Sequence, residues 1–159
     1  MPNYLQQLRQ LIGSRKVIHP AARIIVENEK GEILMIRRKD NGNWGVPAGG
    51  LEENETIAAC MVREVKEETG LDILSMQVIG IITNPKRETV SYPNGDVVQY
   101  FTIEFYSNDW QGDIGMLDTD EIKYAQFVDR SYIAKLPDNE RPIFESLAHF
   151  RETGQPLLD

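Results

Sequence analysis

The hydrophobic pattern of this chain changes period several times, and the order of those changes most restricts the possible fold. Alternating, β-branched stretches typical of strands precede, separate and follow two main helical segments. The first covers residues 56–69 and ends at Gly70, where a helix C-cap is expected. The second runs from about residue 140 to residue 151, with Pro142 near its first turn. Because the connections are too irregular for a βαβ repeat, we predict an α+β (mixed α/β) architecture.

The strand segments themselves can be read from alternation and turn residues. Single strands are predicted for the segments VIHPAARIIVE, EILMIRRK, ILSMQVIGIIT and EIKYAQFVD. The segment KRETVSYPNGDVVQYFTIEFY predicts a long hairpin with its turn at residues 93–96. Leu5, Leu8 and Leu11 recur at helical spacing before Gly13, so residues 1–15 should form a helical extension. We expect this extension to pack on the main domain, residues 16–159, or on a second subunit.

Composition excludes several classes of protein. The 159 residues are 41% hydrophobic and 26% charged, an ordinary globular balance. A formal net charge of −8 argues against duplex nucleic acid or an anionic membrane as partner, although metal ions can bring a polyphosphate to an acidic protein. The single cysteine, Cys60, permits no internal disulfide, and no apolar run approaches the roughly 18 residues needed to span a bilayer. With no signal-peptide pattern at the N-terminus, we predict a cytoplasmic protein.

The first main helix carries an unusual concentration of acidic residues. At about 100° per residue, Glu64, Glu67 and Glu68 share one face, and Lys66 lies on the other side. Only Arg63 flanks them, four residues before Glu67. Like charges at this spacing destabilise a helix by roughly 0.2–0.5 kcal/mol per pair, so the acidic face has a local cost.

Two interpretations of that face are open. It is either a solvated acidic surface or a site for hard divalent cations, which prefer oxygen ligands together with substrate phosphates. The helix should bury a separate stripe, formed by Ala58, Val62, Val65 and Thr69, which is centred roughly a quarter-turn or more from the glutamates.

The surrounding segment, GGLEENETIAACMVREVKEETGL, resembles the Nudix box. That motif is Gly, five residues, Glu, seven residues, then Arg-Glu-aliphatic-x-Glu-Glu-x-Gly-aliphatic. Every specified position is filled, by Gly49, Glu55, Arg63, Glu64, Val65, Glu67, Glu68, Gly70 and Leu71. The preceding segment, EILMIRRKDNGNWGVPAGG, is similar to the family's second strand and its Trp-x-x-Pro approach to the box. The resemblance implies a Nudix-like α/β/α sandwich, with a mixed β-sheet between helices, over residues 16–159.

The resemblance also implies a metal site. In the family, glutamates at the positions of Glu64, Glu67 and Glu68 hold Mg²⁺ or Mn²⁺, often with the backbone carbonyl at the position of Gly49. Arg63 resembles the arginine that orients these glutamates, although its spacing also fits a surface salt bridge. Glu55 either meets the positive end of the helix dipole or contacts metal.

The general base has several candidates. Family members use either a box glutamate, here Glu67, or an acidic residue of a later loop. Asp118, Asp120 and Glu121 precede the last predicted strand, and Glu121 is our choice among them unless that loop is merely solvated. Glu104 lies in a strand pattern and faces one side or the other.

Substrate contacts are expected near the box. Arg37 and Arg38 lie on the preceding strand, where alternation sends only one of them towards a given face, so one contacts phosphate or both end in solvent. Trp44 is a candidate for stacking on a base, as are two tyrosines of the hairpin, Tyr92 and Tyr100. Pro85 lies near the place where an ADP-ribose-hydrolysing subgroup carries a proline.

Together these features predict an Mg²⁺- or Mn²⁺-dependent pyrophosphohydrolase acting on a small nucleotide. ADP-ribose or a nucleotide sugar is the expected substrate class, and a (deoxy)nucleoside triphosphate with a sanitising role is the alternative. A non-catalytic nucleotide-binding module and an RNA 5′-end hydrolase stay open as further alternatives. Family habit and the apolar side of the opening helix suggest a homodimer.

Overall fold

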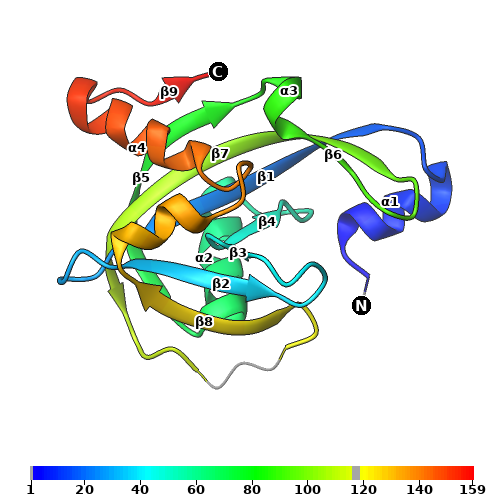
Figure 1. Cartoon of the computed structure of the whole chain (residues 1–159). Helices are drawn as coiled ribbons and strands as arrows, with labels where there is room; N and C mark the ends of the chain where they lie inside the picture. Colours follow the sequence, from blue (N-terminus) through cyan, green and yellow to red (C-terminus); the bar gives the residue numbers. More distant parts are fainter. Residues whose placement is uncertain (1, 116–118) are drawn as a thin grey trace.

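The fold is built on a six-stranded mixed sheet, shown in Figure 1. The computed structural model describes residues 2–115 and 119–159. The sheet order is β4-β1-β7-β5-β9, and β6 also pairs with β7. Its strands are β1 (Val17–Val26), β4 (Ala48–Gly50), β5 (Asp72–Ile82), β6 (Thr89–Ser91), β7 (Val97–Gln111) and β9 (Leu157–Leu158). Because β1 runs parallel to β7 while β5 runs antiparallel to it, the sheet is mixed, as predicted.

A second, three-stranded antiparallel sheet lies beside the first. It consists of β3 (Trp44–Gly45), β2 (Ile33–Arg38) and β8 (Ile122–Val128). Its middle strand, β2, is buried on both sides: Leu34 belongs to one core cluster, and Ile33 and Met35 belong to the other. A strand buried in this way lacks alternation in its apolar residues, so the sequence could not show that it leaves the main sheet.

Two helices cover these sheets and complete the predicted layers (Figure 1). Helix α2 (Ile57–Thr69) contributes Met61 and Val65 to the first core cluster. Helix α4 (Pro142–Thr153) contributes Ile143 and Leu147 to the second cluster, and the short 3₁₀-helix η1 (Arg130–Lys135) precedes it. Among the described residues, no helix is long and apolar enough to cross a membrane.

The ends of α2 agree with the prediction, and its buried side agrees only in part, through Val65 and Thr69. The Thr56 side chain accepts a hydrogen bond from the Ala59 N–H at 3.1 Å, and Gly70 adopts the left-handed conformation at φ 85°. Of the predicted stripe, Ala58 is exposed and Val62 only half-buried. The buried residues are Cys60, Met61, Val65, Glu68 and Thr69. The helix packs on β4 as well as on β1 and β5, which turns its covered side towards Glu68.

The opening helix forms as predicted but does not bury an apolar side. Helix α1 (Tyr4–Ile12) has no buried residue, and Leu11 is 84% exposed. Polar contacts attach it instead: Arg9 Nη2 donates to the Val97 carbonyl at 3.0 Å, and the Tyr4 N–H donates to Glu52 Oε2 at 2.9 Å. It therefore lies beside the β6–β7 hairpin at one end of the molecule (Figure 1).

The predicted hairpin is present with a shorter first strand. Ser91 pairs with Val97, and the turn closes through the Tyr92 N–H, which donates to the Asp96 carbonyl at 2.8 Å. Residues 85–88 do not extend the strand, because Pro85 and the Asn84 cap begin the short helix α3 (Pro85–Glu88). Strand β9, which was not predicted, pairs in parallel with β5.

Candidate active site

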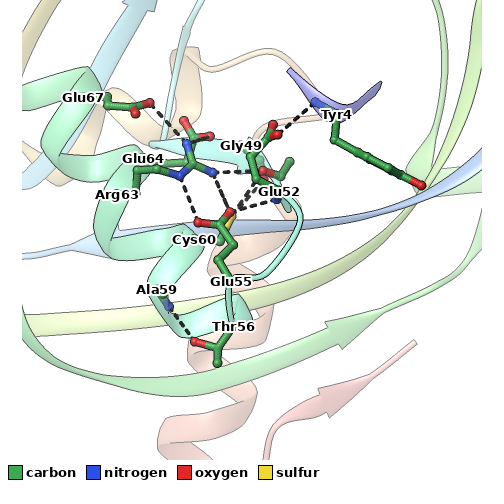
Figure 2. Close-up of polar contacts among 11 residues, drawn as sticks. Tyr4, Gly49, Glu52, Glu55, Thr56, Ala59, Cys60, Arg63, Glu64 and Glu67 are labelled. Carbon is green, nitrogen blue, oxygen red and sulfur yellow. Dashed lines mark hydrogen bonds and ion pairs between the residues drawn. The ribbon is translucent and has the colours of Figure 1, made fainter. Parts of the chain in front are cut away.

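Arg63 is the centre of the polar contacts on α2 (Figure 2). Its Nη2 lies 2.7 Å from Glu55 Oε1, and its Nη1 lies 2.8 Å from Glu64 Oε1 and 3.3 Å from Glu67 Oε2. Nη2 also donates to the Gly50 carbonyl at 3.2 Å. A planar guanidinium with donors in fixed directions holds its partners in fixed directions too. This is the geometry that the predicted orienting role requires.

Glu55 forms an ion pair with Arg63. Hydrogen bonds from Arg63 hold the pKa of the Glu55 carboxyl below its ordinary value, and the Glu52 N–H donates to Glu55 Oε1 at 2.9 Å. The cap of α2 is Thr56, so Glu55 does not cap the helix. The Glu55 carboxylate therefore connects Arg63 to the loop that precedes α2.

Glu64 lies against the loop backbone. Its side chain is only 12% exposed, and a Cβ added to Gly49 would lie 2.0 Å from Glu64 Cδ. Only glycine permits this approach, which brings the Gly49 backbone and the Glu64 carboxylate together. Burial raises the pKa of Glu64, and Arg63 acts in the opposite direction.

Glu68 is the least expected of the acidic residues. It is 4% exposed, and its Oε2 has no hydrogen-bond partner among the described residues. Burial raises the pKa of Glu68 well above its ordinary value, although the charge of Arg38 and the Ala48 backbone act against this. A buried carboxylate oxygen without a partner is costly, so it marks a place where a cation would fit.

The acidic residues of α2 therefore differ sharply in exposure. Glu67 is 60% exposed and faces outward beside Arg63, whereas Glu64 and Glu68 lie on the covered side. Within residues 2–115 and 119–159, no three acidic, histidine or cysteine side chains already surround a common point as a metal cluster. The donor set still suits Mg²⁺ or Mn²⁺, because carboxylate and carbonyl oxygens are the ligands that hard cations prefer. Glu64, Glu68 and the Gly49 carbonyl are the residues that would hold such an ion, with Glu67 at the outer side.

The candidate acidic residues that follow the box in the sequence do not all lie in the same part of the molecule. Glu121 is exposed but close enough to Glu64 and Glu68 to raise the pKa of both carboxyls, so it lies on the same side as the box glutamates. Asp120 is exposed nearby, and Asp118 lies outside the described residues. Glu104 is fully buried and already paired.

Two adjoining clefts open beside Glu121 and the box glycines Gly49 and Gly50. The inner cleft has a volume of about 510 Å³ and is lined by β1 and β4, including Gly49 and Gly50, and by residues 87–92. The outer cleft has a volume of about 640 Å³ and lies between α1, the β6–β7 hairpin and the loop after β2. Arg38, Asp40 and both candidate tyrosines, Tyr92 and Tyr100, line both clefts.

Of the two arginines on β2, Arg38 faces the clefts and Arg37 does not. Arg37 Nε donates to the Gly42 carbonyl at 3.0 Å, which turns it towards the neighbouring loop. The Arg38 guanidinium makes no hydrogen bond or ion pair with the described residues. Its charge nevertheless acts on Glu68 and on Glu140 of the inner cleft. Trp44 lines neither cleft and packs against the second core cluster.

A buried charge network, which the sequence did not reveal, supports the inner cleft. Arg23 Nε lies 3.0 Å from Glu104 Oε2, and Arg23 also pairs with Glu88 at 2.5 Å. Thr102 Oγ1 donates to Glu88 at 2.6 Å, and Ser146 Oγ donates to Glu104 at 2.9 Å. Because its members come from four separate segments, neither periodicity nor spacing could bring them together.

Comparisons with known proteins agree with the box. The family description "NUDIX domain" matches residues 17–150. An ADP-ribose pyrophosphatase of Methanocaldococcus jannaschii is 32% identical over 142 residues, which cover 85% of this chain and 78% of that protein. A putative 8-oxo-dGTP diphosphatase of Bacillus subtilis is 38% identical over 63 residues, covering 40% of this chain and 42% of that protein. A MutT protein structure from Methanosarcina mazei Go1 shares the fold, with a TM-score of 0.68, 24% identity, and coverage of 87% of this chain and 99% of that one.

Proposed function

Because the chain belongs to the NUDIX domain family, we propose that it is a metal-dependent pyrophosphohydrolase of nucleoside diphosphates linked to another group, of the ADP-ribose or nucleotide-sugar type. The observation that carries this is Glu68, a buried carboxylate whose Oε2 has no partner, beside Glu64 and the Gly49 backbone. Such a group destabilises a protein that has no use for it. The substrate class is supported by the match to the Methanocaldococcus jannaschii ADP-ribose pyrophosphatase over most of both chains.

The reaction is the hydrolysis of a P–O–P bridge. Water forms a new bond to one phosphorus, the bridging bond breaks, and the bridging oxygen leaves with its electron pair on the other phosphate. A bound divalent cation neutralises phosphate charge and lowers the pKa of the attacking water. The products are a nucleoside monophosphate and a phosphorylated remainder.

We assign the protein side of this reaction to named residues. Glu64, Glu67, Glu68 and the Gly49 carbonyl would hold the cation, and Arg63 fixes the carboxylates through its contacts with Glu64 and Glu67. The proton of the attacking water passes to an exposed carboxylate on this side. Glu67 is one candidate for that role.

Glu121 is the other candidate base, because it is exposed and acts on both buried box carboxyls. Arg38 contacts substrate phosphate, since it lies where the two clefts meet and has no partner of its own among the described residues. Arg37 is engaged with the loop carbonyl of Gly42 and takes no part. Trp44, which lines neither cleft, is a weaker candidate for substrate contact than the two tyrosines.

The second candidate substrate class is the nucleoside triphosphates, which the match to the Bacillus subtilis protein favours. Product analysis separates the two classes. Wild type and Glu68→Gln are incubated with Mg²⁺ or Mn²⁺ and with ADP-ribose, nucleotide sugars or nucleoside triphosphates, and products are separated by chromatography. Monophosphate release without inorganic pyrophosphate supports the first class, and pyrophosphate release supports the second. No glutamate-dependent turnover on any compound contradicts both.

The homodimer and the cytoplasmic location stay predictions. Multi-angle light scattering tests the first, because a mass of two chains agrees with it and a mass of one chain contradicts it. Helix α1 leaves Leu11 and Ile12 on its outer side, and these are the apolar residues that a second subunit would cover.

A further inference from the structure

The outer cleft adjoins the inner cleft, which is lined by the box glycines Gly49 and Gly50, yet one of its walls comes from outside the matched family region. That wall is α1, which lines the cleft through Asn3, Leu5, Gln6 and Arg9. The family match begins at residue 17, after this helix has ended. The β6–β7 hairpin forms the opposite wall. The size and lining of the cleft are therefore set by a segment that the box does not specify.

Helix α1 is fixed in this position by contacts at both ends. Near its start, the Tyr4 N–H donates to Glu52 Oε2 at 2.9 Å in the box loop, as Figure 2 shows. The Tyr4 ring also stacks on His19 at a centroid distance of 5.9 Å. Further along, Arg9 Nη2 donates to the Val97 carbonyl at 3.0 Å on the hairpin. These contacts hold the wall against both the box loop and the hairpin.

The lining of the outer cleft is mixed in charge and slightly acidic overall. Four carboxylates line it against three cationic side chains, and amide side chains and two tyrosines complete it. Carboxylates and amides accept hydrogen bonds from hydroxyl groups, and tyrosine rings offer a surface for a base or a sugar. A volume of about 640 Å³ also falls within the roughly 300–1,000 Å³ typical of ligand pockets.

Arg38 connects this cleft with the reacting centre. It lines both clefts, has no hydrogen-bond partner among the described residues, and acts electrostatically on Glu68. Gly49 and Gly50 line the inner cleft. A diphosphate placed between the box glutamates and Arg38 would therefore extend one of its arms into the outer cleft.

We propose that the outer cleft is the subsite for one uncharged, hydroxyl-bearing arm of the substrate, a nucleoside or a sugar, and that α1 determines which arms fit. The inference rests on the proposed function for the identity of the whole substrate. Binding of the arm itself requires no hydrolysis, so the two can be tested separately.

The test measures binding of the two halves of ADP-ribose, AMP and ribose 5-phosphate, by isothermal titration calorimetry. Leu5→Trp fills the cleft from α1, and Asn94→Trp narrows it from the hairpin turn. Gln10→Trp is the matched control, because this residue of the same helix is exposed and lines neither cleft. Circular dichroism confirms that each variant is folded.

We expect both cleft variants to weaken binding of the same half by about tenfold or more, and the control to leave it unchanged. The affected half then identifies the occupant as nucleoside or sugar. Equal binding by all variants, or no binding of either half by the wild type, would overturn the proposal. Wild-type hydrolysis that depends on Glu68 tests the proposed function independently. If hydrolysis is absent while the variants still weaken binding, the function is wrong and the subsite stands.

Discussion

Replacing Glu68 by glutamine should make the metal-free protein more stable while removing its activity. Glu68 is 4% exposed and its Oε2 has no partner among the described residues, so its negative charge, when no cation is bound, is buried with only partial compensation from Arg38 and the Ala48 backbone. An unsatisfied buried polar group costs about 1–3 kcal/mol, and a charged one more. Glutamine has nearly the same shape without the charge. We therefore expect the free energy of unfolding in EDTA to rise by about 1–3 kcal/mol.

For a chain of this length, each kcal/mol shifts the melting temperature by about 2–4 °C, so Glu68→Gln should melt about 2–12 °C higher in EDTA. Glu67→Gln is the matched control: this side chain is 60% exposed, and its change should stay within about 0.5 kcal/mol. Differential scanning calorimetry measures both. The reasoning is refuted if Glu68→Gln melts lower than wild type in EDTA, or if the control gains as much.

The difference in stability between Glu68→Gln and wild type should depend on both metal and pH. A ligand that binds only the folded state at 100 times its dissociation constant adds about 2.7 kcal/mol, so Mg²⁺ should raise the melting temperature of wild type and raise that of Glu68→Gln much less. Without metal, the raised pKa of Glu68 means that the folded state favours the protonated carboxyl. The stability gap between variant and wild type is therefore largest above that raised pKa. The gap narrows as the pH falls through the raised pKa, so the narrowing begins at a pH above 4.5, the ordinary pKa of a glutamate carboxyl.

Three further outcomes follow from the structure. Arg38→Ala should lower kcat/KM about 10–150-fold, as expected for the loss of a hydrogen bond of about 1.5–3 kcal/mol to phosphate. Arg37→Ala should change kcat/KM by no more than about twofold. Equal effects of the two variants in steady-state kinetics would contradict the placement of Arg38. Arg23→Leu leaves two buried carboxylates unpaired and should lower the free energy of unfolding by about 3–5 kcal/mol in urea titrations, while a loss under about 1 kcal/mol would show that the network is not needed for the fold. Burial raises the pKa of the Cys60 thiol to about 12, so an alkylating reagent at neutral pH should label it only after denaturation, and rapid labelling of the folded protein would contradict this.

The local elements of the fold were predictable, because their signals lie within short segments. Helix α2 ends at Gly70 as its pattern required, and the β6–β7 turn lies where proline, asparagine and glycine cluster. The position of β2 in a separate sheet was not predictable, since a strand buried on both sides reads as a continuous apolar run. Nor was the position of α1, because polar contacts from Arg9 and Tyr4 hold it rather than its leucines.

Spacing placed three glutamates on one face of α2, and the resemblance to the Nudix box singled them out as metal ligands, but neither predicted that they would differ in burial. A helical wheel places Glu64, Glu67 and Glu68 in one arc, and only the packing of α2 on β4 makes Glu68 buried and Glu67 exposed. Alternation likewise predicted that Arg37 and Arg38 would point to different faces of β2, but it left open whether either would contact substrate. The loop carbonyl of Gly42 makes that choice by binding Arg37.

The most direct test of the account is the Mg²⁺-dependent hydrolysis of ADP-ribose by wild type and by Glu68→Gln, with every product identified by chromatography. The account predicts that wild type releases AMP and ribose 5-phosphate in equal amounts, that EDTA stops the reaction, and that the folded Glu68→Gln variant loses most of the activity. Turnover that persists in EDTA, or that is unchanged in Glu68→Gln, would contradict a metal centre built on the glutamates of α2.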